Sequence, residues 1–329
     1  MIALVTGSTG FIGAHLCRAL CEQGIQVRAF HRPNSSTMLL DGLPVTHAIG
    51  DLTQPETLLP ALKNADVLFH AGALLNGRSG LENLIRVNVE GTRTILDAAL
   101  RQDVKRVVYT SSTAALGAPG LGRGTDFQAE LITEAHTWNL NPEHWRYGYS
   151  KYLSEMEAQY AVSRGLDVVI VNPAVVFGAG NIHRRTNSPV MLVANRRLPV
   201  TVPAGMNIVH IQDVVDGHLA AWHYGQTGER YILGAHNVDV ADLLDRIAKL
   251  TGGKATAFSI PAVLARQLAR FSRLAQIITR TPLDTSLLHL AGYRFFYDTR
   301  KATRELNLPE PQPLDKCVMD TYEWFTKTA

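Results

Sequence analysis

Short runs built mainly from Val, Ile, Leu and Ala recur along the first half of the chain, and they constrain the fold more than any other feature. The runs are IALVT, IQVRAF, VTHAIG, DVLFHAG, KRVVYTSS and LDVVIVNP, which begin at residues 2, 25, 45, 66, 105 and 166. Strands of this kind are covered on both faces, as in a parallel sheet between two layers of helices. The segments 11–23 and 148–163 carry apolar residues at helical spacing. The sequence therefore predicts an α/β fold with a doubly wound parallel sheet.

A glycine-rich turn follows the first run and opens the first helical segment. It reads TGSTGFIG, with Gly7, Gly10 and Gly13 three residues apart. Glycine allows unusual backbone angles and a close approach to a pyrophosphate, and the helix N-terminus offers free N–H groups to phosphate. The position between strand and helix favours a dinucleotide site over a glycine-rich turn without a ligand. The residues expected to line the dinucleotide here are Thr6, Gly7, Thr9, Gly10, Phe11, Ile12 and Gly13.

The alternation of strands and helices weakens after residue 178, which predicts a smaller second lobe. The stretch 196–223 reads as a strand pair followed by a helix. The predicted division is a dinucleotide-binding domain at 1–172, to which 208–235 returns, and a partly interleaved C-terminal substrate lobe at 173–207 and 236–329.

Composition narrows the possible functions. The chain has 329 residues, 46% of them hydrophobic and 19% charged, and its net charge of +3 is not gathered in a Lys/Arg block, so we expect no nucleic-acid partner. Cys17, Cys21 and Cys317 form no C-x-x-C pair, so we expect reduced thiols and no metal site. No signal-like segment or membrane-spanning apolar run is present, and the expected location is cytoplasmic.

The T-G-x-x-G-x-x-G spacing of the glycine turn resembles the extended short-chain dehydrogenase/reductase superfamily, the NAD-dependent epimerase/dehydratase family. The pieces IRVNVEGTRTIL, IVHIQDVVDGH and GERYILG are most similar to bacterial dihydroflavonol-4-reductase-like and hopanoid-associated sugar epimerase-like proteins. The resemblance implies a Rossmann-type fold and an NAD(P)-dependent oxidoreductase. It further implies an adenine cradle at Asp51 and Leu52, adenosine contacts at His70, Ala71, Gly72 and Ala73, and a nicotinamide loop with Pro173, Val175 and Val176.

The end of the second strand bears on the choice of dinucleotide. An acidic residue there suits the ribose 2′-OH of NAD(H), whereas arginine suits the 2′-phosphate of NADP(H). This chain has no acid there but has His31 and Arg32. A guanidinium can bind phosphate in bidentate fashion. We therefore favour NADP(H), with NAD(H) as the alternative if Arg32 is only a solvated loop charge.

Three tyrosines lie close together in RYGYSKYLSE, and only Tyr147 has a lysine four residues later. That spacing places Tyr147 and Lys151 on one helix face. A phenol with an ordinary pKa of about 10 becomes a better acid–base group beside an ammonium, which favours its phenolate. The resemblance implies that Tyr147 and Lys151 are the Y-x-x-x-K pair, that Ser112 aligns the substrate oxygen with Thr113 as the fallback, and that Asn88 organises a proton-relay water.

The substrate region is less defined by the sequence. The loop 114–146 contains Trp138 and Trp145, which we consider candidate contacts for an apolar or ring-bearing small molecule. Arg184, Arg185, Arg196 and Arg197 could bind a diphosphate or be solvated. The basic amphipathic stretch 262–280 could touch a membrane, but core packing is the expected role. The family resemblance also makes a homodimer through helices 81–101 and 148–163 plausible.

Three functions remain open at this point. The favoured one is an NADPH-dependent reductase of a ketone or aldehyde, with Ser112, Tyr147 and Lys151 as its triad. The second is a nucleotide-sugar epimerase or dehydratase that retains NAD. The third is a non-catalytic NADP(H)-binding regulatory protein, which the presence of the Tyr/Lys pair disfavours.

Overall fold

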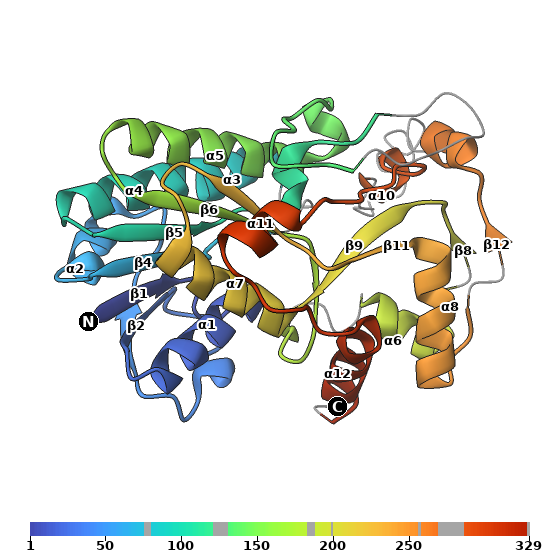
Figure 1. The fold of residues 1–329 in the computed structure, drawn as a ribbon, viewed down its shortest axis with the longest axis horizontal. Coiled ribbons are helices and arrows are strands. Elements are labelled where there is room, and N and C mark those ends of the chain that lie inside the picture. Colours follow the sequence, from blue (N-terminus) through green and yellow to red (C-terminus); the bar gives the residue numbers. More distant parts are fainter. Residues whose placement is uncertain are drawn as a thin grey trace.

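The computed structural model describes residues 1–75, 80–120, 131–182, 188–198, 200–255, 258–268 and 286–327. A seven-stranded, wholly parallel sheet is its largest element, in the order β10-β6-β5-β4-β1-β2-β3 (Figure 1). Its strands are β1 (Ile2–Thr6), β2 (Gln26–His31), β3 (Val45–Ile49), β4 (Val67–His70), β5 (Arg106–Thr110), β6 (Val168–Pro173) and β10 (Arg230–Leu233). This arrangement confirms the predicted Rossmann-type α/β fold.

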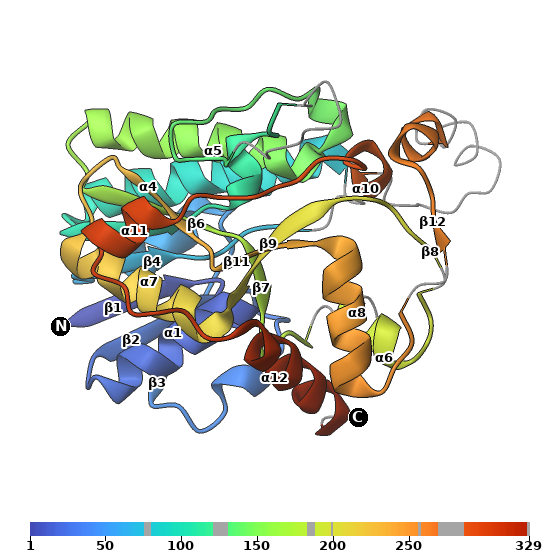
Figure 2. The ribbon, with the colours of Figure 1, turned by 45° about the vertical axis from the view of Figure 1, so that its right-hand side comes forward.

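Helices cover both faces of the sheet, as the apolar strands require. They are α1 (Phe11–Glu22), α2 (Leu58–Leu62), α3 (Gly80–Leu84), α4 (Gly91–Arg101), α5 (Arg146–Ser163), α7 (Ile211–Tyr224) and α11 (Arg300–Glu305). Figures 1 and 2 show α4 and α5 on one side of the sheet and α1 and α7 on the other. A π-helical turn at Ile85–Glu90 joins α3 to α4.

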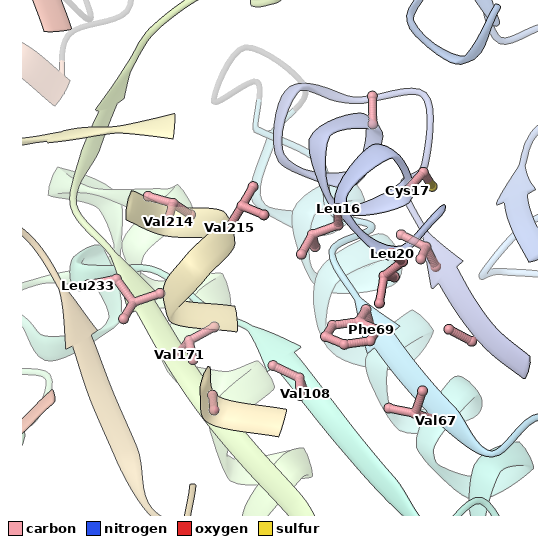
Figure 3. Close-up of a cluster of buried hydrophobic side chains, with 14 of the residues drawn as sticks. Leu16, Cys17, Leu20, Val67, Phe69, Val108, Val171, Val214, Val215 and Leu233 are labelled. Atoms are coloured by element: carbon pink, nitrogen blue, oxygen red, sulfur yellow. The ribbon is translucent and has the colours of Figure 1, made fainter. Parts of the chain in front are cut away.

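Two apolar layers hold the sheet between these helices. Figure 3 shows one of them, in which Leu16 of α1 and Val214 of α7 pack in the same cluster as Phe69 of β4. On the opposite face, Leu4 and Leu68 of the sheet pack with Leu96 of α4. Alternate residues of each strand supply the two layers, which is why the strands read as continuous apolar runs.

The strand order reverses direction between β1 and β4. Chain connections leave β1 toward β2 on one side and reach β4 on the other, so the carboxyl ends of these neighbouring strands open into a crevice. Thr6 ends β1 and His70 ends β4. This crevice is where an open parallel sheet offers space for a ligand.

A smaller lobe gathers beyond the carboxyl ends of the sheet (Figure 2). Its strands and helices are β7 (Val175–Phe177), β9 (Gly205–His210), β11 (His236–Asp239), β8 (Val200–Thr201), β12 (Phe258–Ser259), α6 (Pro189–Ala194), α8 (Val240–Thr251), α10 (Ser286–His289) and α12 (Leu314–Lys327). The core of this lobe joins Val193 of α6, Ile247 of α8 and Val318 of α12.

The predicted strand pair within 196–223 is wrong in its pairing. Both strands exist, but β8 pairs with β12, whereas β9 pairs with β7 and β11. The strands that pair with β8 and β9 are distant in the sequence, and local periodicity does not predict such pairings. After β9 the chain re-enters the large sheet, because α7 packs against its strands and β10 pairs with β6. The proposed lobe boundaries rest on this path.

Part of the predicted substrate region falls outside the described residues. Arg184 and Arg185 lie there, as does the stretch 262–280 beyond residue 268. Of the two remaining arginines, Arg197 is exposed and Arg196 has a positive φ of 56° in the turn after α6. Within the described ranges, no helix has both the length and the apolar character to cross a membrane.

The packing of α1 on the sheet gives a stability prediction. Leu16 is fully buried in the core, so we expect Leu16→Ala to lower the free energy of unfolding by about 2–5 kcal/mol, measured by urea titration. The control Arg18→Ala, on the exposed side of the same helix, should change it by less than about 0.5 kcal/mol. Equal effects of the two substitutions would contradict this packing.

Candidate active site

The glycine turn is packed so closely that side chains are excluded at two positions. Gly7 has a φ of +65°, and a Cβ there would lie 2.8 Å from the backbone of Ala71 and Gly72. A Cβ on Gly13 would lie 2.2 Å from the carbonyl oxygen of Gly7. Gly10 begins α1 without any side-chain cap, so the first N–H groups of this 12-residue helix remain available to an anion. The turn can therefore hold a dinucleotide pyrophosphate.

The remaining residues of the predicted turn surround this helix start. Thr9 is half-buried, and Phe11 packs edge-on to His15 with ring centroids 5.4 Å apart. Ile12 packs against the core beneath α1. The motif is therefore anchored by apolar contacts on one side while its backbone faces the crevice.

A buried hydrogen-bond line connects this turn to the helical layer. The Oγ1 of Thr6 lies 2.7 Å from Nδ1 of His70 and accepts a hydrogen bond from the Gly72 N–H at 3.1 Å. The other ring nitrogen of His70 lies 3.0 Å from Oγ1 of Thr92 on α4. Burial and the nearby ammonium of Lys151 lower the pKa of His70 to about 3, so its ring is neutral at physiological pH.

The residues predicted near adenosine lie along the same crevice. The carboxylate of Asp51 accepts two hydrogen bonds from Thr53, each 2.9 Å long, while Leu52 is buried in the core. Ala71 is half-buried and Ala73 is exposed. Arg32 is exposed directly after β2. The roles of these residues stay predictions.

Tyr147 lies in the first turn of α5, and Lys151 follows one turn later. Lys151 is buried, and its Nζ donates hydrogen bonds to Oη of Tyr109 at 2.7 Å and to the Thr110 carbonyl at 2.9 Å. Burial lowers the pKa of Lys151 to about 7, although the nearby carboxylate of Glu155 favours the charged form. Lys151 thus sits against the carboxyl end of β5, the strand adjacent to β4.

Tyr109 is a site residue that the sequence pattern did not reveal. It is fully buried, stacks on His70 with centroids 5.4 Å apart, and lies beneath the Lys151 ammonium. Burial raises the pKa of its phenol well above the ordinary value, so Tyr109 remains a neutral acceptor. Through Tyr109, the glycine turn is linked to the helix that carries Tyr147.

Glu155 extends the same helix face by one more turn. It is buried and accepts hydrogen bonds from Ser111 at 2.5 Å, Asn172 at 2.6 Å and Arg230 at 3.1 Å. Asn172 also donates to the Ser112 carbonyl at 3.0 Å. These bonds tie the carboxyl ends of β5 and β6, and the first residue of β10, to α5. The spacing of four from Lys151 was visible in the sequence, but the partners of Glu155 were not.

Ser112 and Thr113 begin the short helical turn after β5. Ser112 is half-buried, and its Oγ accepts a hydrogen bond from the Ala114 N–H at 3.2 Å. Thr113 is buried. Ser112 therefore lies just beyond the end of β5. It is two residues after Thr110, whose carbonyl accepts a hydrogen bond from Lys151. Its alignment of a substrate oxygen stays a prediction.

Asn88 lies in the π-helical turn and is fully engaged by protein groups. Its side chain accepts from the Leu74 N–H at 2.7 Å and donates to the Leu74 carbonyl and to Ser150, both at 3.0 Å. It therefore fixes the segment after β4 against α5. A role in organising a water stays a prediction.

The segment after β6 leads from the sheet into the second lobe. Pro173 ends β6, and Val175 and Val176 begin β7. Val175 is 39% exposed, while Val176 is half-buried. The predicted nicotinamide-flanking segment thus starts at the same sheet edge as the glycine turn.

Both candidate tryptophans pack near the start of α5. Gly148 makes room for them, because a Cβ there would lie 2.8 Å from Trp138 and 3.1 Å from Trp145. Trp145 also meets Phe295 with ring centroids 5.2 Å apart, whereas Trp138 stacks on Tyr152 at 6.4 Å. Aromatic side chains from distant parts of the chain therefore gather at the start of α5, and their contact with a substrate stays a prediction.

Residues 3–234 match the family model described as "NAD dependent epimerase/dehydratase family". The chain is 35% identical over 329 residues to "Putative dihydroflavonol 4-reductase" of Synechocystis sp., covering 98% of this chain and 93% of that protein. It is 32% identical over 341 residues to "Sterol demethylase protein B" of Methylococcus capsulatus, covering 99% and 98%. A solved nucleoside-diphosphate-sugar epimerase from Pseudomonas aeruginosa superposes with a TM-score of 0.81 at 26% identity, covering 100% and 98%.

The buried ammonium of Lys151 predicts an unusual dependence of stability on pH. The folded protein has a lowered pKa of about 7 at this lysine, so between pH 7 and the ordinary value of 10.5 the unfolded chain binds more protons. The charge therefore costs stability at neutral pH and costs less as pH rises. We expect Lys151→Met to raise the unfolding free energy at neutral pH by about 2 kcal/mol or more, a gain that fades toward pH 10.

The measurement is urea unfolding of the nucleotide-free protein across this pH range. Lys105→Met is the matched control, because the Lys105 side chain is 77% exposed and pairs with Asp66 at the surface. It should show no comparable gain. A Lys151→Met protein that is less stable than the parent at neutral pH would mean that the ammonium is net stabilising in its place.

Proposed function

Because the chain belongs to the NAD dependent epimerase/dehydratase family, we propose that it is an NADPH-dependent oxidoreductase that reduces a ketone or aldehyde of a largely apolar or ring-bearing small molecule. The observation that carries the proposal is the linkage of Lys151 to the glycine turn through Tyr109 and His70. Tyr147 lies one helical turn before Lys151 on α5, which supports an acid–base pair at the sheet edge suited to a dinucleotide.

The turn, the β2 end and the β6 exit would hold the dinucleotide, which supplies the hydride when bound. Tyr147 donates its phenolic proton to the carbonyl oxygen that gains negative charge. Lys151, one helical turn away, favours the phenolate that remains. Ser112 donates a hydrogen bond to the same oxygen and aligns it. Glu155 and Asn172 keep the strand ends and α5 in register during this step.

Two features support NADP(H) over NAD(H). No acidic residue stands at the end of β2 to accept a hydrogen bond from a ribose 2′-OH, and Arg32 follows that strand in an exposed position. A guanidinium there suits a 2′-phosphate.

The apolar or ring-bearing substrate is supported by the aromatic cluster and by two relatives. Trp145, Phe295 and Tyr293 line up in successive ring contacts beside the start of α5. The Synechocystis relative is named for a dihydroflavonol and the Methylococcus relative for a sterol, both ring-bearing molecules. Apolar rings of this kind bury well against aromatic side chains.

A nucleotide-sugar epimerase or dehydratase that retains NAD is the second candidate. The structural similarity to the Pseudomonas epimerase favours it. The β2 end, with His31 and Arg32 in place of an acid, argues against it. A protein that binds NADP(H) without catalysis is disfavoured, because the chain keeps both Tyr147 and Lys151.

We also propose that the protein forms a homodimer through helices 81–101 and 148–163. Met156 and Tyr160, one turn apart on α5, are 43% and 58% exposed, so both side chains could pack against a second copy.

Replacing the proposed proton donor tests the mechanism. Tyr147→Phe should lower kcat for carbonyl reduction by at least about 100-fold, because general acid catalysis is lost, while NADPH binding measured by fluorescence titration stays within about twofold. Tyr149→Phe is the matched control, because Tyr149 packs against Trp138 through its ring and should keep near-parental turnover. Equal turnover of the Tyr147→Phe and parental proteins would remove Tyr147 from the mechanism.

A further inference from the structure

One arginine side chain ties the loop 131–140 to α5. Arg230 is the first residue of the edge strand β10, and its side chain is 20% exposed. One terminal nitrogen of the guanidinium donates to the carboxylate of Glu155 on α5 at 3.1 Å. The other donates to the carbonyl oxygens of Glu134 and His136, the second of these at 3.1 Å. Arg230 therefore connects the helix, the sheet edge and the loop.

The first half of this loop is fastened along the sheet edge. Strand β10 pairs with β6 on one side, so its outward backbone groups need other partners. The Ile232 N–H donates to the carboxylate of Glu134 at 3.0 Å. At the start of the loop, the Ile132 N–H donates to the Phe296 carbonyl at 2.8 Å, and the Ile132 carbonyl accepts from the Asp298 N–H at 2.9 Å. The loop thus enters the contact with Arg230 from a fixed position.

The second half of the loop carries Trp138 onto α5. Trp138 lies two residues after His136, whose carbonyl oxygen Arg230 holds. Its indole packs on Gly148, where an added Cβ would lie 2.8 Å from the ring. Gly148 directly follows Tyr147, so Trp138 lies against the turn of α5 that contains the proposed proton donor.

These contacts form a closed frame that begins and ends on α5. One end is Glu155, eight residues or about two helical turns after Tyr147, and the other end is Gly148. Arg230 and Trp138 lie between the two ends. The loop cannot move away from α5 without breaking its bonds to Arg230. The frame therefore holds the indole at a fixed place relative to Tyr147.

The acceptors around the guanidinium suit arginine better than lysine. A guanidinium presents five N–H donors in fixed directions, whereas an ammonium is a compact point charge. Arg230 uses its donors for one carboxylate and two carbonyl oxygens. The carboxylate, on Glu155, is 1% exposed and also accepts from Ser111 and Asn172. The variant Arg230→Lys would keep a positive charge beside Glu155 but would lose the fork that holds both loop carbonyls.

We propose that Arg230 is a positioning residue that fixes Trp138 against the start of α5 and thereby sets the affinity for a ring-bearing substrate. The inference deepens the proposed function and rests on its site. Arg230 is engaged by Glu155 and the loop, so it acts through Trp138 and not on the reacting oxygen. A fixed indole offers a flat apolar surface to a ring, and binding is weaker when the indole must be ordered first.

The test is steady-state reduction of 2-tetralone, a ketone with two fused rings, by NADPH. Arg230→Lys should raise the KM for 2-tetralone about fivefold, the effect expected from having to order one large side chain on binding. The kcat and the Kd of NADPH should stay within about twofold, because the weakened contact is made equally in the ground state and the transition state.

Arg106→Lys is the matched control. The Arg106 side chain is 23% exposed, pairs with Asp167 at 2.7 Å and donates to the Trp222 carbonyl at 2.9 Å. It therefore resembles Arg230 in burial and in its types of partner, but it does not hold the loop. Arg106→Lys should leave the KM for 2-tetralone at the parental value.

Two further measurements separate positioning from a general loss of structure. Trp138→Leu should raise KM by a similar factor, and adding Arg230→Lys to it should cause little further rise, because both substitutions remove the same contact. Amide hydrogen exchange, followed by mass spectrometry, should be faster at residues 131–140 in Arg230→Lys and parental in Arg106→Lys.

Parental exchange of the loop in Arg230→Lys would overturn the inference, as would KM effects that multiply in the double variant. A fall in kcat with an unchanged KM would also overturn it, because Arg230 would then act on the chemical step. The proposed reduction would still stand in each of these cases. A parental protein that binds NADPH but reduces neither 2-tetralone nor another ring-bearing ketone would overturn the proposed function, and with it the role of Arg230 in substrate affinity.

Discussion

The close contact between the backbone of the glycine turn and the segment after β4 is the constraint on which the rest of the site depends. Gly13 lies directly beneath the Gly7 carbonyl, and Gly7 itself abuts Ala71 and Gly72. No larger residue fits these places without moving backbone. The contact forms at the point where the strand order reverses, and it fixes the start of α1 against the segment after β4.

From this contact, a line of buried polar groups leads to α5, the helix that carries Tyr147 and Lys151. Thr6 contacts His70, His70 stacks on Tyr109, and Tyr109 accepts from Lys151. Each member is neutral except the lysine. Burial of its ammonium lowers the stability of the folded protein, because the charge is removed from water. An ammonium held at such a cost is typical of a functional site, because a purely structural role would be served by an apolar residue.

Much of the fold was predictable from the sequence, because strands buried on both faces are recognisable as continuous apolar runs. The strands β1 and β4 and the helix α5 follow directly from local periodicity, although the observed bounds of β4 (Val67–His70) and α5 (Arg146–Ser163) differ by a few residues from the predicted ones. The pairing of β8 with β12 could not be predicted from local periodicity, because it joins segments far apart in the sequence.

The candidate site shows the same division between local and distant contacts. Tyr147 and Lys151 were visible because both lie on one helix face. Tyr109 was not, because its importance comes from a contact between the sheet and the helix that covers it. From the sequence alone, a tyrosine in an apolar strand is expected to be a packing residue. Only the structure shows that the Tyr109 hydroxyl accepts a hydrogen bond from the Lys151 ammonium.

The proposed reduction is tested most directly by incubating the purified protein with NADPH and a panel of apolar, ring-bearing ketones, while NADPH absorbance and alcohol product are followed together. We expect one NADPH to be consumed for each alcohol formed, with repeated turnover as cofactor exchanges. It would be contradicted by a protein that purifies with tightly held NAD and interconverts nucleotide sugars without consuming added cofactor.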